Sequence, residues 1–226
     1  MNPTSGTNAS NGGRGPLGKH EIAALIARDI PHGAFVNLGI GQPTLVADHL
    51  GAGSAVVLHT ENGMLNMGPA AHEDELDPDL TNAGKVPVTE LPGAAYFHHA
   101  DSFAMMRGGH LDLCVLGAFQ VSAAGDLANW HTGAPDAVPA VGGAMDLAIG
   151  AKRVFVMMTL FAKDGAPKLV PECGYPLTGL ACVDRVYTDF AVFDLTGQGV
   201  TVTETFGITP AELAARLETP LTFAGA

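Results

Sequence analysis

The sequence is poor in basic residues. It holds 11 Lys and Arg against 23 Asp and Glu, which leaves a formal net charge of −12 at pH 7. Nucleic acids and anionic membranes attract proteins through clustered Lys and Arg, so this balance argues against both. We therefore expect neither nucleic acid nor membrane among the partners.

Cysteine and long apolar runs are scarce as well. Cys114, Cys173 and Cys182 form no CxxC pair and are odd in number, which disfavours a disulfide scaffold or a zinc site. No apolar stretch approaches the length of a membrane span, and no basic segment followed by an apolar one opens the chain. The expectation is a reducing, cytoplasmic location.

Apolar residues are plentiful, at 47% of the 226 residues, which is enough for one sizeable α/β domain. Residues 1–18 are the exception, because the few apolar side chains there cannot offset the entropy lost on ordering. We predict a flexible N-terminal tail over residues 1–18 and a folded domain over residues 19–226.

The spacing of apolar residues predicts the main elements. A helical period runs through residues 19–30 and stops at Pro31. Nearly continuous apolar runs at residues 35–38, 55–59, 111–116 and 153–159 are typical of strands covered on both faces. Helical stretches at residues 44–50 and 145–149 fall between some of them. This order predicts an α/β fold with a mostly parallel sheet flanked by helices.

The C-terminal part has a different pattern. Strand-like segments at residues 186–187, 190–194 and 200–204 are closely spaced, with a turn signal at residues 196–199, and predict antiparallel edge strands. Thr209, Pro210 and Glu212 then supply an N-cap, a first-turn proline and a capping-box glutamate. We expect a closing helix through about Leu217.

One carboxylate follows a strand-like run directly. Residues 55–59 lead into Thr60, Glu61, Asn62 and Gly63, and Asn-Gly readily takes the left-handed turn that lifts a side chain into a cleft. By position alone, a glutamate at a strand end is more often a surface or ion-paired carboxylate than a catalytic one. The flanking residues decide between these alternatives.

Two pairs of glycines precede helical stretches. Gly142 and Gly143 leave unblocked backbone N–H groups at a helix start, although a tight strand-to-helix turn is the favoured interpretation from sequence alone. Gly39 and Gly41 lack the third glycine of a dinucleotide-binding turn, because Thr44 stands in its place. They indicate a strand-to-helix connection, or a loop that closes on a substrate beside Glu61.

The histidines do not predict a metal site. His98, His99 and His110 are poorly spaced for ligation, and no HExxH segment occurs. Structural, hydrogen-bonded roles are the favoured interpretation.

Seven segments together resemble the B (beta) subunit of the two-subunit 3-oxoacid CoA-transferases, within the family I CoA-transferases. They follow in that family's order between residues 19 and 221: VNLGIGQPT, TENGMLNMGP, HHADSFAMMRGGHLD, LGAFQVSAAGDLANW, PDAVPAVGGAMDLA, KDGAPKLV and PLTG. The resemblance implies an open α/β sheet and makes Glu61 the nucleophile that attacks an acyl-CoA thioester. The candidates for oxyanion or substrate contacts are Gly142, Gly143, Asn62, Gly39 and Gly41.

Within this family, HHADSF and TGAPDAVPAVGGAMD resemble the 3-oxoadipate enzymes of aromatic degradation. The implied reaction moves CoA from succinyl-CoA to 3-oxoadipate through a glutamyl-CoA thioester, with coenzyme A as part of the substrate and no tightly bound cofactor or metal. Two residues depart from the family pattern. Thr60 replaces the usual Ser and keeps its hydroxyl, and Asn66 replaces the usual Gly, where Asn is the side chain most tolerant of a left-handed backbone.

Coenzyme A is a polyanion, yet this acidic chain has nothing that resembles the glycine-rich CoA-binding half of such enzymes. The resemblance therefore implies a separate A (alpha) subunit, an active site at the interface of the two subunits and a heterotetramer. Lys163 and Lys168 are interpreted as solvated surface charges, with contact to a CoA phosphate as the minor alternative. Three alternative functions stay open: an acetoacetate CoA-transferase with succinyl-CoA or acetyl-CoA as donor, an acyl-CoA hydrolase, and a ligand-sensing domain without activity.

Overall fold

The computed structural model describes residues 15–51, 53–134, 136, 138–139, 141–197 and 199–225. In these residues ten strands form one open sheet in the order β13-β12-β11-β10-β8-β5-β1-β2-β3-β4, and three short strands form a second sheet, β7-β6-β9. The helices are α1 (Lys19–Asp29), the 3-10 helix η1 (Gln42–His49), α2 (His99–Arg107), α3 (Ala144–Gly150) and α4 (Pro210–Arg216). The described helices include none with the length and apolar run needed to cross a bilayer.

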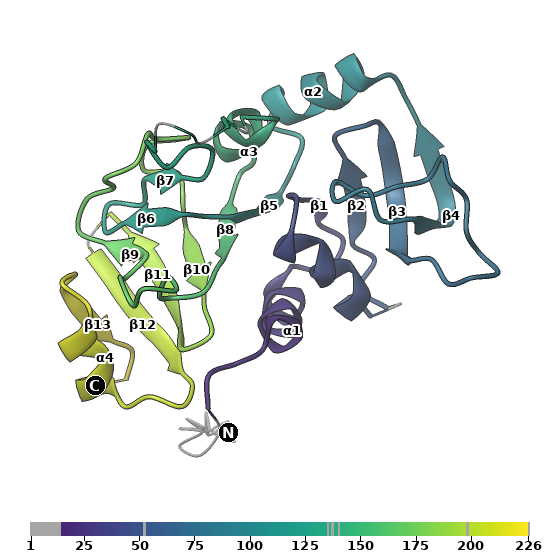
Figure 1. Cartoon of the computed structure of the whole chain (residues 1–226). Helices are drawn as coiled ribbons and strands as arrows, with labels where there is room; N and C mark the ends of the chain where they lie inside the picture. The colour runs from purple at the N-terminus through teal and green to yellow at the C-terminus, as the bar shows by residue number, and fades with distance from the viewer. Residues whose placement is uncertain are drawn as a thin grey trace, which may run out of the picture.

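The strands of the large sheet are β1 (Phe35–Leu38), β2 (Val57–Thr60), β3 (Met64–Ala70), β4 (Val88–Tyr96), β5 (Leu113–Gly117), β8 (Val154–Met157), β10 (Arg185–Tyr187), β11 (Ala191–Thr196), β12 (Gly199–Thr205) and β13 (Leu221–Phe223). Those of the small sheet are β6 (Gln120–Ser122), β7 (Leu127–Ala128) and β9 (Leu169–Val170). Figure 1 shows β2, β3 and β4 at one end of the large sheet and β10, β11 and β12 at the other, with α1 between them.

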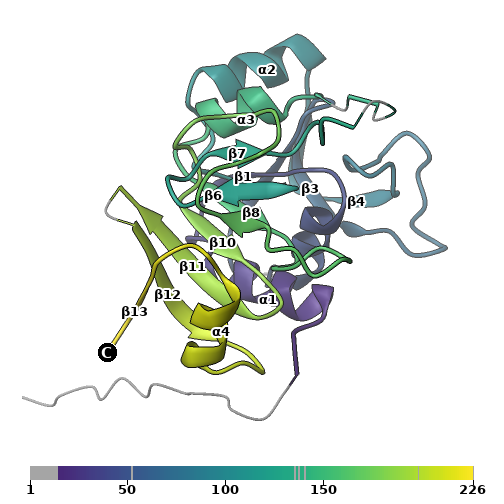
Figure 2. The ribbon, with the colours of Figure 1, turned by 60° about the vertical axis from the view of Figure 1, so that its left-hand side comes forward.

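The centre of the large sheet is parallel, which confirms the predicted α/β class. Neighbouring strands run in the same direction from β2 through β1, β5 and β8 to β10. Alternate residues of these strands face opposite cores: Leu113 and Val115 of β5 pack with α1 and η1, and Cys114 and Leu116 pack with α3 and the small sheet. Figures 1 and 2 show α3 and the small sheet together beside β8. Burial on both faces is why these strands read as continuous apolar runs.

The C-terminal strands are antiparallel where the sequence predicts it, since β11 pairs antiparallel with both β10 and β12. The closing helix begins as predicted. The Glu212 backbone N–H donates to Thr209 Oγ1 at 3.2 Å, and the Thr209 N–H donates to Glu212 Oε2 at 2.9 Å. Beyond the prediction, β13 adds a strand parallel to β12, and β3 and β4 extend the opposite end of the sheet in antiparallel fashion.

Residues 1–14 of the predicted tail lie outside the described residues. At the end of that segment, the Leu17 N–H donates to the Asp189 carbonyl at 2.8 Å, and the Leu17 side chain packs against the core. Leu17, within the predicted tail, therefore contacts the folded part of the chain.

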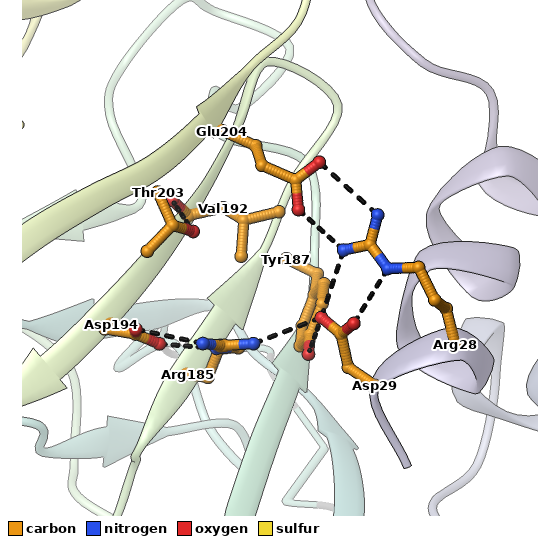
Figure 3. Close-up of polar contacts among 8 residues, drawn as sticks. All are labelled: Arg28, Asp29, Arg185, Tyr187, Val192, Asp194, Thr203 and Glu204. Carbon is orange, nitrogen blue, oxygen red and sulfur yellow. Dashed lines mark hydrogen bonds and ion pairs between the residues drawn. The ribbon is translucent and has the colours of Figure 1, made fainter. Parts of the chain in front are cut away.

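Charged side chains join α1 to the C-terminal strands (Figure 3). Arg185 pairs with Asp194 on the neighbouring strand and with Asp29 of α1, the latter at 3.1 Å. Arg28 pairs with Glu204 of β12 at 2.6 Å, and the Tyr187 hydroxyl donates to Asp29 at 3.0 Å. We call Arg28, Asp29, Arg185, Tyr187, Asp194 and Glu204 the ionic cluster.

Candidate active site

The carboxyl ends of β1, β2, β5 and β8 meet at one edge of the sheet and surround a cavity of about 760 Å³. After β1 the chain continues to β2 on one side and later returns to β5 on the other, so β1 marks a topological switch point. Open α/β sheets bind ligands outside the strand ends at such a point. The cavity is therefore where this topology predicts a ligand site.

Five of the six site residues predicted from the sequence line this cavity: Gly39, Glu61, Asn62, Gly142 and Gly143. Gly41 is not among the lining residues. The fold thus collects three segments that lie far apart in the chain.

Glu61 stands on the tight turn between β2 and β3. The Gly63 N–H donates to the Thr60 carbonyl at 3.2 Å and closes the turn. Gly63 itself has a φ of 111°, and a Cβ there would collide with the Phe97 carbonyl oxygen, so only glycine fits. The Glu61 side chain is half-buried, and within the described residues its carboxylate has no hydrogen bond or ion pair. The turn fixes the backbone of Glu61, and its unpaired carboxylate is free to react with a bound substrate.

Gly143 lies directly against this carboxylate. A Cβ added at Gly143 would collide with Glu61 Oε2 and lie 3.0 Å from Cδ. Gly142 needs glycine for a different reason, because its φ of 48° is left-handed while the space around it is open. The pair forms the predicted turn before α3, although a loop rather than a strand precedes it. The turn and the contact with Glu61 therefore exist together.

Behind the turn runs a line of hydrogen bonds that we call the neutral chain: Asn37, His59, Ser102 and the Thr60 carbonyl. The Asn37 amide nitrogen lies 3.1 Å from the His59 carbonyl and 3.0 Å from His59 Nδ1, so its two hydrogens reach both acceptors. That assignment leaves the His59 proton on Nε2, which lies 3.0 Å from Ser102 Oγ. The Ser102 hydroxyl in turn donates to the Thr60 carbonyl at 2.9 Å.

Burial lowers the pKa of His59 to about 4, so the imidazole is uncharged at neutral pH. The side chains of the chain are buried, and every member has a partner. A fully satisfied buried network holds one geometry, and this one ends at the residue before Glu61.

The other glycine segment follows β1, the strand that neighbours β2. Gly39 donates its N–H to the Val115 carbonyl at 2.8 Å, and a Cβ there would meet the same oxygen at 3.1 Å. Gly41, with a φ of 89°, opens η1 through its carbonyl, which accepts the Thr44 N–H at 3.2 Å. Asn62 is held on the turn because its amide donates to the Thr81 carbonyl at 3.2 Å.

Both departures from the family pattern fit the backbone. Asn66 has a φ of 60°, in the left-handed region where the family's glycine would sit, and its amide donates to the Pro92 carbonyl at 3.3 Å. Thr60 Oγ1 accepts the Met64 N–H at 2.9 Å across the turn. The hydroxyl oxygen at position 60 serves as this acceptor, and Thr provides one just as Ser would.

Sequence reasoning missed two groups of site residues. His59 and Ser102 went unnoticed, although a lone histidine within an apolar strand was an available signal. The interpretation of Lys168 as a solvated surface charge is wrong, because this side chain is half-buried and lines the cavity. Lys163 is exposed, in agreement with the prediction.

The three cysteine thiols are protonated and lie outside this cavity. Burial raises the pKa of Cys173 and Cys182 to about 11 and that of Cys114 further, so the thiols stay protonated at neutral pH. None of the three is among the cavity-lining residues. The described part of the chain contains no group of three or more His, Cys, Asp and Glu side chains placed to hold a metal.

Comparison with known proteins gives a consistent result. The family model of the coenzyme A transferases matches residues 19–207. The chain is 64% identical over 188 residues to the B (beta) subunit of 3-oxoadipate CoA-transferase from Pseudomonas putida, covering 83% of this chain and 88% of that one. It is 60% identical over 188 residues to the polypeptide of the same name from Acinetobacter baylyi, covering 83% of this chain and 87% of that one.

Among solved structures, the fold is similar to that of the acyl-CoA transferase YdiF of Escherichia coli O157:H7, with a TM-score of 0.70 and 20% identity. The match covers 93% of this chain and 42% of that one, so this chain spans less than half of the YdiF polypeptide. At this identity the match shows a shared fold alone.

Proposed function

The chain belongs to the coenzyme A transferase family, and from that premise we propose that it is the glutamate-bearing beta subunit of a 3-oxoadipate CoA-transferase. The single observation that carries the proposal is the Glu61 carboxylate, unpaired among the described residues and pressed against Gly143 in the cavity at the strand ends. The identity to the Pseudomonas and Acinetobacter proteins supports 3-oxoadipate as the acceptor.

The proposed reaction begins with attack of a Glu61 oxygen on the thioester carbonyl of succinyl-CoA. The carbon–sulfur bond breaks, and a mixed succinyl-glutamyl anhydride and CoA thiolate result. The thiolate then attacks the glutamyl carbonyl, which releases succinate and leaves CoA on Glu61 as a thioester. Attack by a 3-oxoadipate carboxylate reverses the two steps and yields 3-oxoadipyl-CoA. Coenzyme A enters and leaves as part of the substrates.

Each attack passes through a tetrahedral oxyanion that needs a preorganised donor. The backbone at Gly142 and Gly143 is our candidate, because Gly143 lies against the Glu61 carboxylate. The oxyanion forms on the substrate carbonyl beside Glu61 when Glu61 attacks, and on the glutamyl carbonyl itself when the CoA thiolate attacks. Gly39 and Asn62, which line the cavity, are candidates for contacts with the substrate, and Gly41 for the shape of the loop beside them.

A partner chain, the alpha subunit, completes the proposal. The names of the two relatives describe each as one subunit of a transferase, and this chain carries a net charge of −12 although its proposed substrate is a polyanion. We propose that the alpha subunit supplies most of the contacts to coenzyme A and that the two chains assemble as a heterotetramer.

The test is a transfer assay with succinyl-CoA and 3-oxoadipate, run on the purified chain, on the alpha subunit, and on the mixture. Only the mixture should turn over. Acetoacetate in place of 3-oxoadipate tests the closest alternative, and release of free CoA thiol without any acceptor tests hydrolysis. Full activity of this chain alone, or faster transfer to acetoacetate, would overturn the respective part of the proposal.

A further inference from the structure

Besides Glu61, the residues that line the cavity include two lysines, the exposed Lys85 and the half-buried Lys168, and the role of Lys168 is open. Across the described residues, the six ion pairs use Arg28, Arg107, Lys152 and Arg185 as cations, and Lys168 takes part in none of them.

The backbone fixes Lys168 firmly in the wall. The Lys168 N–H donates to the Leu160 carbonyl at 2.9 Å, and the Val121 N–H donates to the Lys168 carbonyl at 2.9 Å. The residue therefore enters the cavity from the junction of the two sheets, directly before β9.

Burial lowers the pKa of Lys168, and the Asp189 carboxylate offsets only part of that effect. Among the described residues Asp189 forms no ion pair with Lys168, and its Oδ1 accepts the Leu160 N–H at 2.8 Å. A half-buried ammonium without a close counter-ion is costly by itself, and an anion placed beside it removes the cost.

The placement of the two charges matches the substrates. In the sheet, β5 and β1 separate β8, whose end leads to Leu160, from β2, whose end leads to Glu61. Three strand spacings put the carboxyl ends of β8 and β2 roughly 14 Å apart at the backbone. Glu61 and Lys168 both line the cavity at these strand ends, and its volume of about 760 Å³ leaves room for a short acyl chain.

Resting on the proposed function, we propose that Lys168 binds the distal carboxylate of dicarboxylic acyl groups while their other carboxyl reacts at Glu61. Succinyl and 3-oxoadipyl groups both carry such a second carboxylate, and acetoacetate does not. Lys168 would then make this a site for dicarboxylic substrates.

A CoA phosphate is the other anion that a lysine could bind. Phosphate groups are usually held by several donors together. Two lysines line the cavity, and they lie on different segments: Lys168 is half-buried before β9, whereas Lys85 is exposed in the connection between β3 and β4. The distal carboxylate, with its single charge, is the better match.

The experiment uses the chain assembled with the alpha subunit, and it compares two competitive inhibitors of equal length, adipate and hexanoate. For the wild type, adipate should bind at least tenfold more tightly than hexanoate. Lys168→Met should weaken adipate by about tenfold to a hundredfold, the worth of one charge-assisted hydrogen bond, and leave hexanoate unchanged. Lys168→Arg should keep most of the discrimination. Lys163→Met is the matched control, because Lys163 lies on the same loop, is exposed and is not a lining residue.

Equal weakening of both inhibitors, or persistent discrimination in Lys168→Met, would overturn the inference. An increased KM for acyl-CoA esters whatever their acyl group would assign Lys168 to a phosphate instead. If Lys168→Met does not assemble with the alpha subunit, the inhibition constants of the wild-type enzyme still test the inference. Equal binding of adipate and hexanoate by the wild type would contradict it. Wild-type transfer to 3-oxoadipate is measured alongside, so that failure of the proposed function is recognised separately.

Discussion

The neutral chain beneath Glu61 and the ionic cluster at the other end of the sheet differ in burial and in charge. The chain of Asn37, His59 and Ser102 is buried, uncharged and satisfied at every step, and it ends at the Thr60 carbonyl. The ionic cluster joins α1 to β10, β11 and β12 through charges that remain partly in water (Figure 3).

The two regions should differ in how much a substitution costs in stability and turnover. A buried hydrogen-bonded network is costly to break, because each orphaned group loses its partner and does not regain water. Exposed ion pairs are weak because solvent screens them. We therefore expect substitutions near Glu61 to affect both turnover and stability, and substitutions at the ionic cluster to have little effect on either.

The largest effect should come from the glycine that touches the carboxylate. In Gly143→Val, the added Cβ collides with Glu61 Oε2, and the turnover should fall by on the order of a hundredfold or more, comparable to the loss of an oxyanion donor. Gly51→Val is the matched control, because Gly51 has ordinary φ and open space around it. Steady-state kinetics of the assembled enzymes checks this, and a fully active, assembled Gly143→Val enzyme would make the contact irrelevant.

The next effect is a dependence of stability on pH that comes from His59. Its pKa is about 4 in the folded protein against an ordinary value of 6.5, so between these values the unfolded chain binds the proton and the folded one does not. Stability should therefore be complete above pH 6.5 and decline as the pH falls toward 4, by roughly 3 kcal/mol at most.

Denaturant unfolding between pH 7 and pH 4 measures this slope. His59→Gln should flatten it, whereas His72→Gln, at an exposed histidine, should leave it unchanged. An equal slope in wild type and His59→Gln would show that the neutral chain does not exclude the proton.

Removal of one hydroxyl from the neutral chain should have a somewhat smaller effect. Ser102→Ala leaves the buried His59 Nε2–H without its acceptor and removes one of the two donors to the Thr60 carbonyl, which keeps the Gly63 N–H. This should cost about 1–3 kcal/mol of unfolding free energy. Because the Thr60 carbonyl then relaxes beside Glu61, we also expect turnover to fall by about tenfold with little change in KM.

The matched control removes a hydroxyl at the other end of the sheet. Thr203 Oγ1 donates to the Val192 carbonyl at 3.3 Å, and Thr203→Val should cost less than about 1 kcal/mol and leave turnover unchanged. If both hydroxyl deletions cost the same, the contrast between the two regions is wrong.

The smallest effect is expected at the ionic cluster. The Arg28 side chain is 49% exposed, so Arg28→Ala should cost below about 1 kcal/mol, and the loss should shrink at high salt. Turnover should not change. Chemical denaturation at low and high salt measures both, and a loss of several kcal/mol would show that the cluster acts as a buried network.

The features that could be predicted from the sequence are those encoded within a short stretch of residues. Short apolar runs identify β1 and β8 because both faces of those strands are buried, and Thr209 with Glu212 identifies the start of α4. Glu61 and the glycine pair were found because each lies within one short segment. β4 escaped prediction because most of its residues are exposed, which erases the apolar alternation.

The rest depends on contacts between distant parts of the chain. His59 and Ser102 are 43 positions apart in the chain, and the fold brings Ser102 of α2 to the end of β2, where it bonds to His59 and to the Thr60 carbonyl. Lysine is ordinarily a surface residue, and the burial of Lys168 arises where the two sheets join. No local sequence pattern predicts the His59–Ser102 contact or the burial of Lys168.

The central claim, that Glu61 carries the coenzyme during transfer, has a direct measurement. The assembled enzyme is incubated with succinyl-CoA without acceptor, treated with borohydride or hydroxylamine to fix the thioester carbonyl, digested and analysed by mass spectrometry. We predict the modification on Glu61, and its absence, together with loss of transfer activity, in Glu61→Ala. Modification on Cys114, Cys173 or Cys182, or normal turnover by Glu61→Ala, would contradict the account.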